Sequence, residues 1–327
     1  MGGRHQSPRG QARRSHDGGR APPAPRRPLS VRNVDAPGAL LALLVSVFWG
    51  ANPVAIKLGL MDTPPLRLAW MRFVVGAVAV VIWGAWTGRL TGLRIARHEW
   101  RPLLVLGVLF TAQIGSMNIG TSLTSAAHAA ILLNSYAVHT VVLAHFMIPG
   151  DRLSLQRLAG VVIAYGGIVL LFGRELTAGG STLLGDAIMF GSAFLLAERT
   201  IYLARAVQNL DPLKLILSQA VIGGTLFLVT SALFETRPTE WTGRLVAVIA
   251  YQGVLIAGFN FVVNLWLLKR YRPSSLATYF LTQPIFGVLA AAVFTGDALT
   301  IEVLVASLAV AAGIGLTTIR PLRRPAI

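Results

Sequence analysis

The chain has 327 residues, of which 54% are hydrophobic and only 13% are charged, and it contains no cysteine. Soluble domains carry about 25% charged residues, so this composition indicates a protein whose solvent is lipid. The lack of cysteine excludes disulfides, thiolate metal sites and thiol catalysis. The formal net charge is +16, but most basic residues separate apolar runs instead of covering one face, which argues against nucleic-acid binding.

Both ends of the chain are basic tails. Residues 1–36 are rich in Pro, Gly and Arg and contain eight of the 29 basic residues. Such a segment cannot bury enough apolar surface to fold, so we predict a disordered tail there. A second, shorter basic tail occupies residues 320–327.

Ten apolar runs lie between these tails. A bilayer core about 30 Å thick is crossed by about 20 helical residues, and the runs with that length are 38–60, 65–86, 102–122, 126–147, 155–173, 183–204, 213–234, 245–268, 274–295 and 299–318. Several connections have only four or five residues, so neighbouring helices are antiparallel. The first run carries Trp49 and Lys57 and lacks a small-residue cleavage site, so it is read as a retained signal anchor. We predict an all-α integral membrane protein with ten transmembrane helices.

The loops between the runs differ in charge. One set carries most of the basic residues, including Arg152 and Arg205, whereas the other has only Arg174, Arg237 and Arg244 between spans. Because Lys and Arg are retained on the cytoplasmic side, we predict a multi-pass protein of the plasma (inner) membrane with both termini in the cytoplasm.

A short phrase occurs twice in the chain. Gly150-Asp151 aligns with Gly296-Asp297, and a second match, "PLRL" at 65–68 and "PLKL" at 212–215, has nearly the same offset. Each half would contain five spans, and because five is odd the halves would cross the membrane in opposite senses. The pattern predicts two inverted five-helix repeats, an architecture typical of carriers with a central site. Chance recurrence of a Gly-Asp turn is the alternative, and the second match weighs against it.

With these motifs, the chain resembles the drug/metabolite transporter superfamily, specifically the EamA-type ten-helix exporters. The resemblance rests on "FWGANPVAIKLG" in the first span, Arg72-Phe73 in the second, "GD" before the sixth, and "QPIFGVLAA" followed by "GDALT" near the end. It covers roughly residues 38–318 and implies EamA-like repeats at 37–175 and 182–319. The sequence departs from the family pattern in having Asp for Glu in both Gly-Asp phrases. It also has Val138 where a proline is usual, which predicts that the first half lacks the kink expected at Pro284 in the second.

Two of the cations inside predicted spans, Lys57 and Arg72, are candidate site residues. Lys57 lies near the outer end of the first span, where its ammonium either reaches the outer headgroups or lines a site. Arg72 lies about 10 Å below the outer surface in the second span. Two cations at similar depth need an anion between them, and both a protein acid and a substrate carboxylate or phosphate fit.

The sixth span carries three ionisable residues. Asp186 is expected to cap the start of its helix, where negative charge is favoured, and Arg199 is expected to reach the cytoplasmic surface. Glu198, in the inner half of the span, is the candidate for proton coupling, because burial raises the pKa of a carboxyl group toward neutrality. The alternative for Glu198 is an ion pair with an arginine.

The fourth span contains three histidines. His128 and His139 are eleven residues apart, so they share a helix face with Ser135. This stripe is a candidate cavity lining, with packing as the alternative. No acid stands at metal-ligand spacing, so no metal site is expected.

Uncharged polar residues are concentrated in spans 3, 4, 8 and 9. Amides join helices in lipid, but the family resemblance implies that these spans line the substrate path. The remaining candidate substrate-binding residues are Gln113, Asn118, Asn260, Asn264, Tyr279 and Gln283.

The sequence therefore favours a secondary transporter, an exporter working by alternating access on a small polar or amphipathic metabolite. No Walker motif or phosphate-binding Gly-rich loop is present, and no cofactor is expected. The partners expected are a small-molecule substrate and the lipid bilayer, without nucleic acid, and a homodimer is a candidate assembly. A membrane-embedded enzyme acting on lipid or prenyl substrates and a non-transporting scaffold are the alternatives. The substrate, the direction of transport and the energy source are left open.

Overall fold

A computed structural model of the protein describes residues 2–3, 34–88, 90, 93–147, 153–177, 182–206, 209–271, 276 and 279–318. Residues 31–327 form one compact unit, to which all the helices below belong. The tails expected at residues 1–36 and 320–327 lie almost entirely outside the described residues, and so does the first Gly-Asp phrase.

The regular elements of the described residues are all helices. The first half of the chain forms α1 (Ala36–Leu60), α2 (Pro65–Trp86), α3 (Trp100–Leu123), α4 (Ala126–Asn134), α5 (Tyr136–Met147) and α6 (Leu155–Thr177). The second half forms α7 (Leu183–Ala206), α8 (Pro212–Phe234), α9 (Gly243–Ala250), the π-helix η1 (Tyr251–Asn260), α10 (Phe261–Arg270), α12 (Gln283–Phe294) and α13 (Ile301–Thr318).

Polar side chains fix the starts of several helices. Asp35 accepts a hydrogen bond from the Gly38 amide at 3.0 Å at the start of α1, and Asp211 accepts one from Leu213 at 2.8 Å at the start of α8. These bonds satisfy amide groups that have no partner within the helix. Capping also sets the start of α2, where both oxygens of Glu235, at the end of α8, accept the amides of Leu66 and Arg67. These polar side chains therefore supply the acceptors that the first amide groups of the apolar helices lack.

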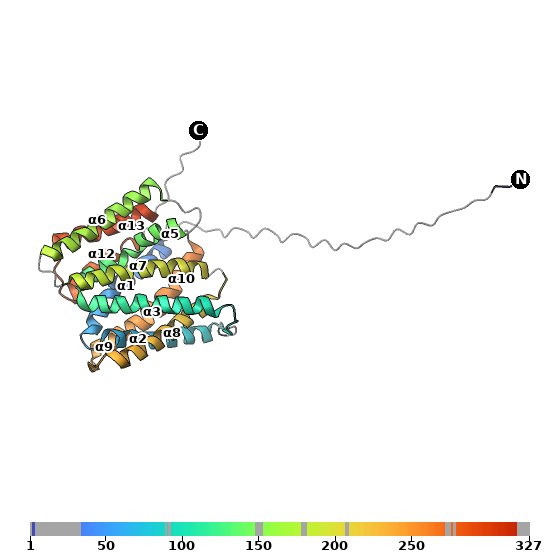
Figure 1. Cartoon of the computed structure of the whole chain (residues 1–327), viewed down its shortest axis with the longest axis horizontal. Coiled ribbons are helices and arrows are strands. Elements are labelled where there is room, and N and C mark those ends of the chain that lie inside the picture. Colours follow the sequence, from blue (N-terminus) through green and yellow to red (C-terminus); the bar gives the residue numbers. More distant parts are fainter. Residues whose placement is uncertain are drawn as a thin grey trace, which may run out of the picture. The chain divides into compact units, whose positions relative to one another are not determined.

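Helices of the two halves pack in an exchanged pattern (Figure 1). α1 packs against α12, and α7 packs against α4 and α5, so the first helix of each half meets the fourth span of the other half. α2 lies beside α8 and α6 lies beside α13, which pairs corresponding helices across the junction. The core is formed at this junction, with buried residues such as Leu68, Ile131 and Val310 drawn from both halves.

The second Gly-Asp phrase joins the two halves. Gly296 lies two residues after the end of α12 and has a φ of 73°, a left-handed conformation that favours glycine. Asp297 then accepts the Ala127 amide at 2.7 Å, at the start of α4 in the other half. The phrase therefore ends one helix and caps another that lies 170 residues away.

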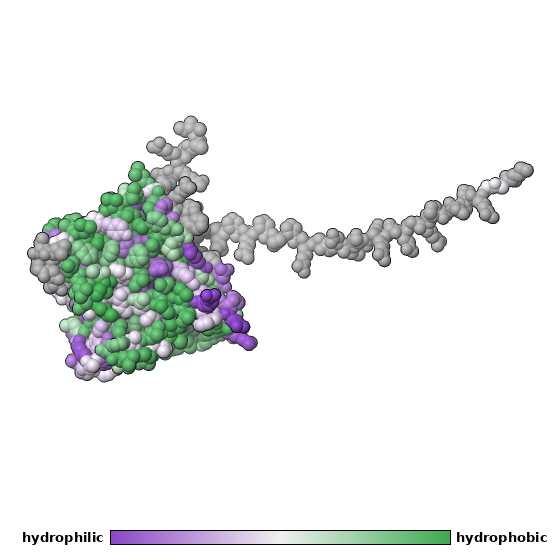
Figure 2. Space-filling model, viewed as in Figure 1, coloured by the Kyte–Doolittle hydropathy of each residue, from purple (hydrophilic) through white to green (hydrophobic). Residues whose placement is uncertain are grey.

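Within the described residues, seven helices are long and apolar enough to cross a bilayer: Ala36–Leu60, Pro65–Trp86, Trp100–Leu123, Ala126–Met147, Leu155–Gly173, Pro212–Phe234 and Gly243–Asn264. Two apolar helices, Gln283–Phe294 and Ile301–Thr317, are shorter. Figure 2 shows apolar residues over much of the visible face of the bundle, as expected for a surface that meets lipid. The chain is therefore a multi-pass helical membrane protein, and the count of ten spans stays a prediction.

Candidate functional site

Arg72 lies inside the bundle. Its side chain projects from α2, about 10 Å along the helix from Pro65, and the residue is only 4% exposed. One nitrogen, Nη1, donates to Gln252 Oε1 of η1 at 2.6 Å. The Nε group is buried and has no hydrogen-bond partner among the described residues. Arg72 is thus a buried cation with a neutral partner.

Arg199 of α7 lies near Arg72. Its guanidinium carbon is 5.1 Å from the ring centre of Phe110 in α3, and its Nε and Nη1 atoms are buried without a partner in the described part of the chain. The expectation that this side chain reaches the cytoplasmic surface is wrong. The guanidinium packs on an aromatic ring, and it is close enough to Arg72 for the two positive charges to interact. Tyr136, the first residue of α5, also lies within reach of its charge.

Irregular backbone adjoins this pair of arginines. The fourth span is interrupted at Ser135, between α4 and α5, although Val138 replaces the proline usual there. The Ser135 amide bonds to Leu132 O at 3.2 Å and the Val138 amide to Ser135 O at 2.9 Å, a tighter pattern than that of an α-helix. Asn134 and Ser135 also donate their side chains to backbone carbonyls within the same helix. The hydrogen-bond pattern of the fourth span is therefore interrupted without a proline, and the expected lack of a kink in the first half stays a prediction.

The π-helix η1 is the second irregular segment, and it begins at Tyr251, one residue before Gln252. Inside a membrane, irregular backbone is tolerated where it is buried in protein or lines a cavity. Tyr136 and Gln252 thus stand at the two places where the helical pattern changes.

Lys57 has other partners than expected. Its ammonium donates to the carbonyls of Thr121 and Ser122 at 3.1 and 3.4 Å, and also to that of Thr124. These carbonyls end α3, where a cation is favoured. Lys57 also interacts electrostatically with Asp297. The anion expected between Lys57 and Arg72 is not needed to explain Lys57, which holds the end of a helix.

His128 is paired with an acid. Its Nδ1 lies 3.0 Å from Asp186 Oδ2, and Asp186 is fully buried. The other oxygen of Asp186 accepts the hydroxyl of Thr124, and Thr182 donates to Oδ2 at 3.4 Å. Asp186 does lie in the first turn of α7, but its side chain reaches α4. The pair joins the starts of α4 and α7.

His139 packs in an aromatic group. Its ring centre lies 4.8 Å from that of Phe190, 5.6 Å from Tyr165 and 6.0 Å from Phe194. His128 and His139 therefore both face α7, consistent with the shared face expected from their spacing. Their role as a cavity lining stays a prediction, as does that of Ser135, which bonds to Leu132.

Three predicted amides join helices. Gln113 of α3 donates to Ser192 Oγ of α7 at 3.4 Å, and Asn118 donates to Pro65 O at 2.8 Å. Asn260 donates to Val45 O of α1 at 3.2 Å. Their oxygens remain buried without a partner among the described residues, so each amide has unused hydrogen-bonding capacity facing the interior.

The other predicted residues are less engaged. Gln283 is buried at the start of α12, and its Nε2 is unpaired among the described residues. Asn264 Oδ1 is likewise buried and unpaired among the described residues. Tyr279 is half-buried, and its backbone carbonyl accepts a hydrogen bond from Ser46 Oγ at 3.1 Å. Glu198 is half-buried and forms no ion pair within the described part of the chain. Its role in proton coupling is not tested by this geometry.

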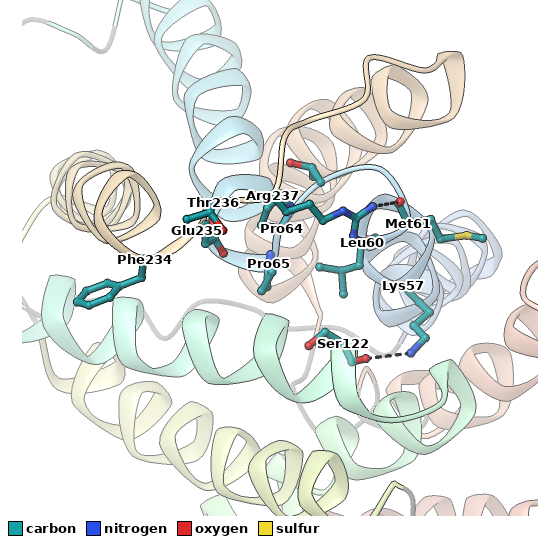
Figure 3. Close-up of a pocket in the computed structure, with 11 residues that line it drawn as sticks. Lys57, Leu60, Met61, Pro64, Pro65, Ser122, Phe234, Glu235, Thr236 and Arg237 are labelled. Atoms are coloured by element: carbon teal, nitrogen blue, oxygen red, sulfur yellow. Dashed lines mark hydrogen bonds between the residues drawn. The ribbon is translucent and has the colours of Figure 1, made fainter.

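A separate pocket of about 480 Å³ opens at the end of α1. Figure 3 shows Lys57, Glu235 and Arg237 around it. Each of these charges is already used, because Lys57 and Arg237 hold backbone carbonyls and Glu235 caps α2. We therefore place the candidate binding centre at Arg72 and Arg199, whose buried nitrogens have no partner among the described residues, and not at this pocket. The described residues contain no group of three or more His, Asp or Glu side chains that could hold a metal ion.

Sequence reasoning missed three members of this centre, Arg199, Tyr136 and Gln252. A signal existed for Gln252, a lone amide in the middle of an apolar span. For Arg199, the position along the span indicates the depth of the residue but not the direction in which its side chain points.

The helical fold is that of a multi-pass membrane protein, and comparison with known sequences identifies its class as a transporter. The model of the EamA-like transporter family matches residues 36–173 and again residues 183–319. The chain therefore belongs to the EamA-like transporter family, within the drug/metabolite transporter superfamily.

Relatives of similar length support this assignment. The "Uncharacterized transporter YoaV" of Bacillus subtilis (strain 168) is 23% identical over 86% of this chain and 96% of its own length. The "Probable amino-acid metabolite efflux pump" of Salmonella typhimurium is 28% identical over 84% of this chain and 92% of its own length. A solved structure described as "Crystal structure of protein" has the same fold, with a TM-score of 0.62 at 18% identity over 86% of this chain and 97% of that one.

Proposed function

We propose that this protein is a secondary transporter that exports a small amphipathic metabolite across the plasma membrane by alternating access. The observation that carries the proposal is the pair of arginines, Arg72 buried and Arg199 half-buried, whose buried nitrogens have no partner among the described residues. Arg72 comes from the first family repeat and Arg199 from the second, so both halves contribute to one centre. In lipid, unpaired ionisable groups are rare and mark the path of a substrate or ion.

Alternating access needs two halves that can move relative to each other. The exchanged packing, in which the first helix of each half meets the fourth span of the other, supports inverted five-helix repeats at 37–175 and 182–319. The cap that Asp297 places on α4 is a contact that such a movement would change. In this proposal the Arg72–Arg199 centre stays fixed while contacts at the two ends open in turn.

Export is supported by the relatives whose printed names describe amino-acid metabolite efflux. We assign both termini to the cytoplasm from the distribution of basic residues. Glu198 is the proposed proton-coupling group, because it is half-buried without an ion pair in the described part of the chain.

The test is transport in liposomes containing the purified full-length chain. Labelled amino acids and their 2-oxo acid analogues are loaded inside, and efflux is followed by filtration against protein-free liposomes. We expect protein-dependent efflux of at least one compound without chemical change. Chemical conversion without flux would favour an enzyme. If no compound of the panel is either transported or converted, this proposal is contradicted.

Coupling is tested with Glu198→Gln in the same liposomes under an imposed pH gradient. We expect the gradient to drive efflux by the original chain and to have no effect on the variant. A gradient effect that survives the substitution would remove Glu198 from the mechanism.

A further inference from the structure

Arg72 and Arg199 each lie over one of two aromatic rings that contact each other. The guanidinium carbon of Arg72 is 4.8 Å from the ring centre of Phe73, and that of Arg199 is 5.1 Å from the ring centre of Phe110. The two rings themselves are 4.7 Å apart in an edge-to-face arrangement. Cations over aromatic faces are stabilised by the ring quadrupole, but this attraction leaves their N–H groups without acceptors.

The hydrogen-bonding capacity of the pair is unfilled. Three buried nitrogens, Nε of Arg72 and Nε and Nη1 of Arg199, have no partner among the described residues. The only described hydrogen bond of either guanidinium is that from Arg72 to the neutral Gln252. Buried donors without acceptors are destabilising, so an acceptor at this place would be strongly held.

The charge of the pair is uncompensated as well. The ion pairs found in the described part of the chain join other residues, and none involves Arg72 or Arg199. Glu198 precedes Arg199 on the same helix, so it points about 100° away. Two like charges that repel each other in a lipid-embedded interior favour an anion between them.

We propose that Arg72 and Arg199 form an anion subsite that holds the carboxylate of the transported molecule, and that Phe73 and Phe110 form the apolar surroundings of this subsite. This inference rests on the proposed transport function and names its substrate class. A carboxylate carries two oxygens with about four lone-pair sites, which suits three free donor nitrogens. Phe227, stacked on Phe73 with ring centres 6.2 Å apart, extends the apolar wall. The substrate is therefore an amphipathic monocarboxylate.

The experiment measures ligand-dependent thermal stability of the purified full-length protein with three phenyl compounds of similar size. They are 3-phenylpropionate, the neutral 3-phenylpropionamide and phenyl phosphate. We expect the carboxylate to raise the melting temperature of the original chain in a saturable way, and the amide to have no effect. An equal shift with the amide would overturn the anion subsite, and tighter binding of phenyl phosphate would replace carboxylate with phosphate ester as the class.

Variants locate the subsite. Arg72→Gln and Arg199→Gln should each weaken 3-phenylpropionate about tenfold or more, since each removes charge-assisted hydrogen bonds. Arg199→Lys should recover part of the affinity, because it restores the charge but not the planar fork. The matched control is Arg101→Gln, at an exposed arginine near the start of α3, which should bind as tightly as the original chain. If Arg72→Gln does not fold, the two Arg199 variants decide the question.

Transport measurements distinguish failure of the anion subsite from failure of the proposed transport function. Efflux of labelled 3-phenylpropionate that is unaffected by either arginine substitution would overturn the subsite and leave the transporter standing. Arginine-dependent binding without any flux would retain the subsite and contradict the transport function.

Discussion

The backbone carbonyls of Gly160 in α6 and Gly313 in α13 each lie where the other residue would carry a side chain. A Cβ atom on Gly160 would lie 2.7 Å from Gly313 O, and a Cβ atom on Gly313 would lie 2.5 Å from Gly160 O. Backbone atoms cannot yield as a flexible side chain can, so both positions require glycine. These two glycines are therefore used to pack α6 against α13 within the chain, because small residues let helices approach closely. The homodimer stays a prediction, and this seam is not available to form it.

Gly160→Val should destabilise the protein by about 1–3 kcal/mol, the usual range for overpacking. The control is Gly166→Val on the same helix, where a new Cβ atom meets nothing within 4 Å. Thermal melts of both variants in detergent give the comparison. Equal melting temperatures for the two variants would show that α6 and α13 are not packed in this way.

Asp297→Ala should destabilise the protein by about 1 kcal/mol, because the Ala127 amide loses its cap. Asp297→Asn should have a smaller effect, because the amide oxygen can still accept the bond. Chemical unfolding followed by helix circular dichroism measures the difference. An Asn variant as unstable as the Ala variant would indicate that the charge of Asp297, near Lys57, matters more than the cap.

Asp62 and Arg244 predict a pH dependence of stability. Arg244 donates two bonds to Asp62, at 2.9 and 2.6 Å, and its guanidinium holds the pKa of that carboxyl below the usual range. The stabilisation is therefore complete above the unfolded pKa of about 3.9 and is lost as pH falls through the lower folded pKa. The melting temperature of Asp62→Asn should be below that of the original chain near neutral pH, with the gap closing below about pH 4.

Glu240→Gln, at an exposed carboxyl in the loop between α8 and α9, is the comparison for this experiment. Its charge also acts on Arg244 but no hydrogen bond joins the two side chains among the described residues, so it should lower the melting temperature less than Asp62→Asn does. A gap between Asp62→Asn and the original chain that persists unchanged into acid would rule out the ion pair as its cause.

The absence of cysteine makes the orientation directly testable, because one introduced thiol is the only thiol present. Arg237→Cys should react with an impermeant reagent added to intact cells, and Arg270→Cys should react only after permeabilisation. Both positions are exposed in the structure. The reverse labelling pattern would invert the proposed topology, and Thr236→Cys, also exposed, repeats the first measurement without removing the bonds of Arg237 to Leu60 and Met61.

Much of the helical architecture could be predicted from the sequence. The boundaries of α1, α2 and α8 fall within a few residues of the predicted runs, because long apolar stretches bounded by Pro, Asp and Gly leave few alternatives in lipid. The eighth span was predicted as one helix, but its central part is a π-helix from Tyr251 to Asn260. Hydrophobicity carries no signal for that difference, because the composition is the same in either geometry.

The sequence by itself determined that this chain is a helical membrane protein of duplicated design, because burying apolar residues in lipid and pairing every backbone group depend on composition and length. Only the tertiary structure decided which polar residues meet. Arg72 finds Gln252 180 residues away, Lys57 turns to the end of α3, and Arg199 turns inward onto Phe110. The physical reason is that a span's residues fix its depth in the membrane, whereas its rotation and its neighbours are fixed by packing against helices distant in the chain.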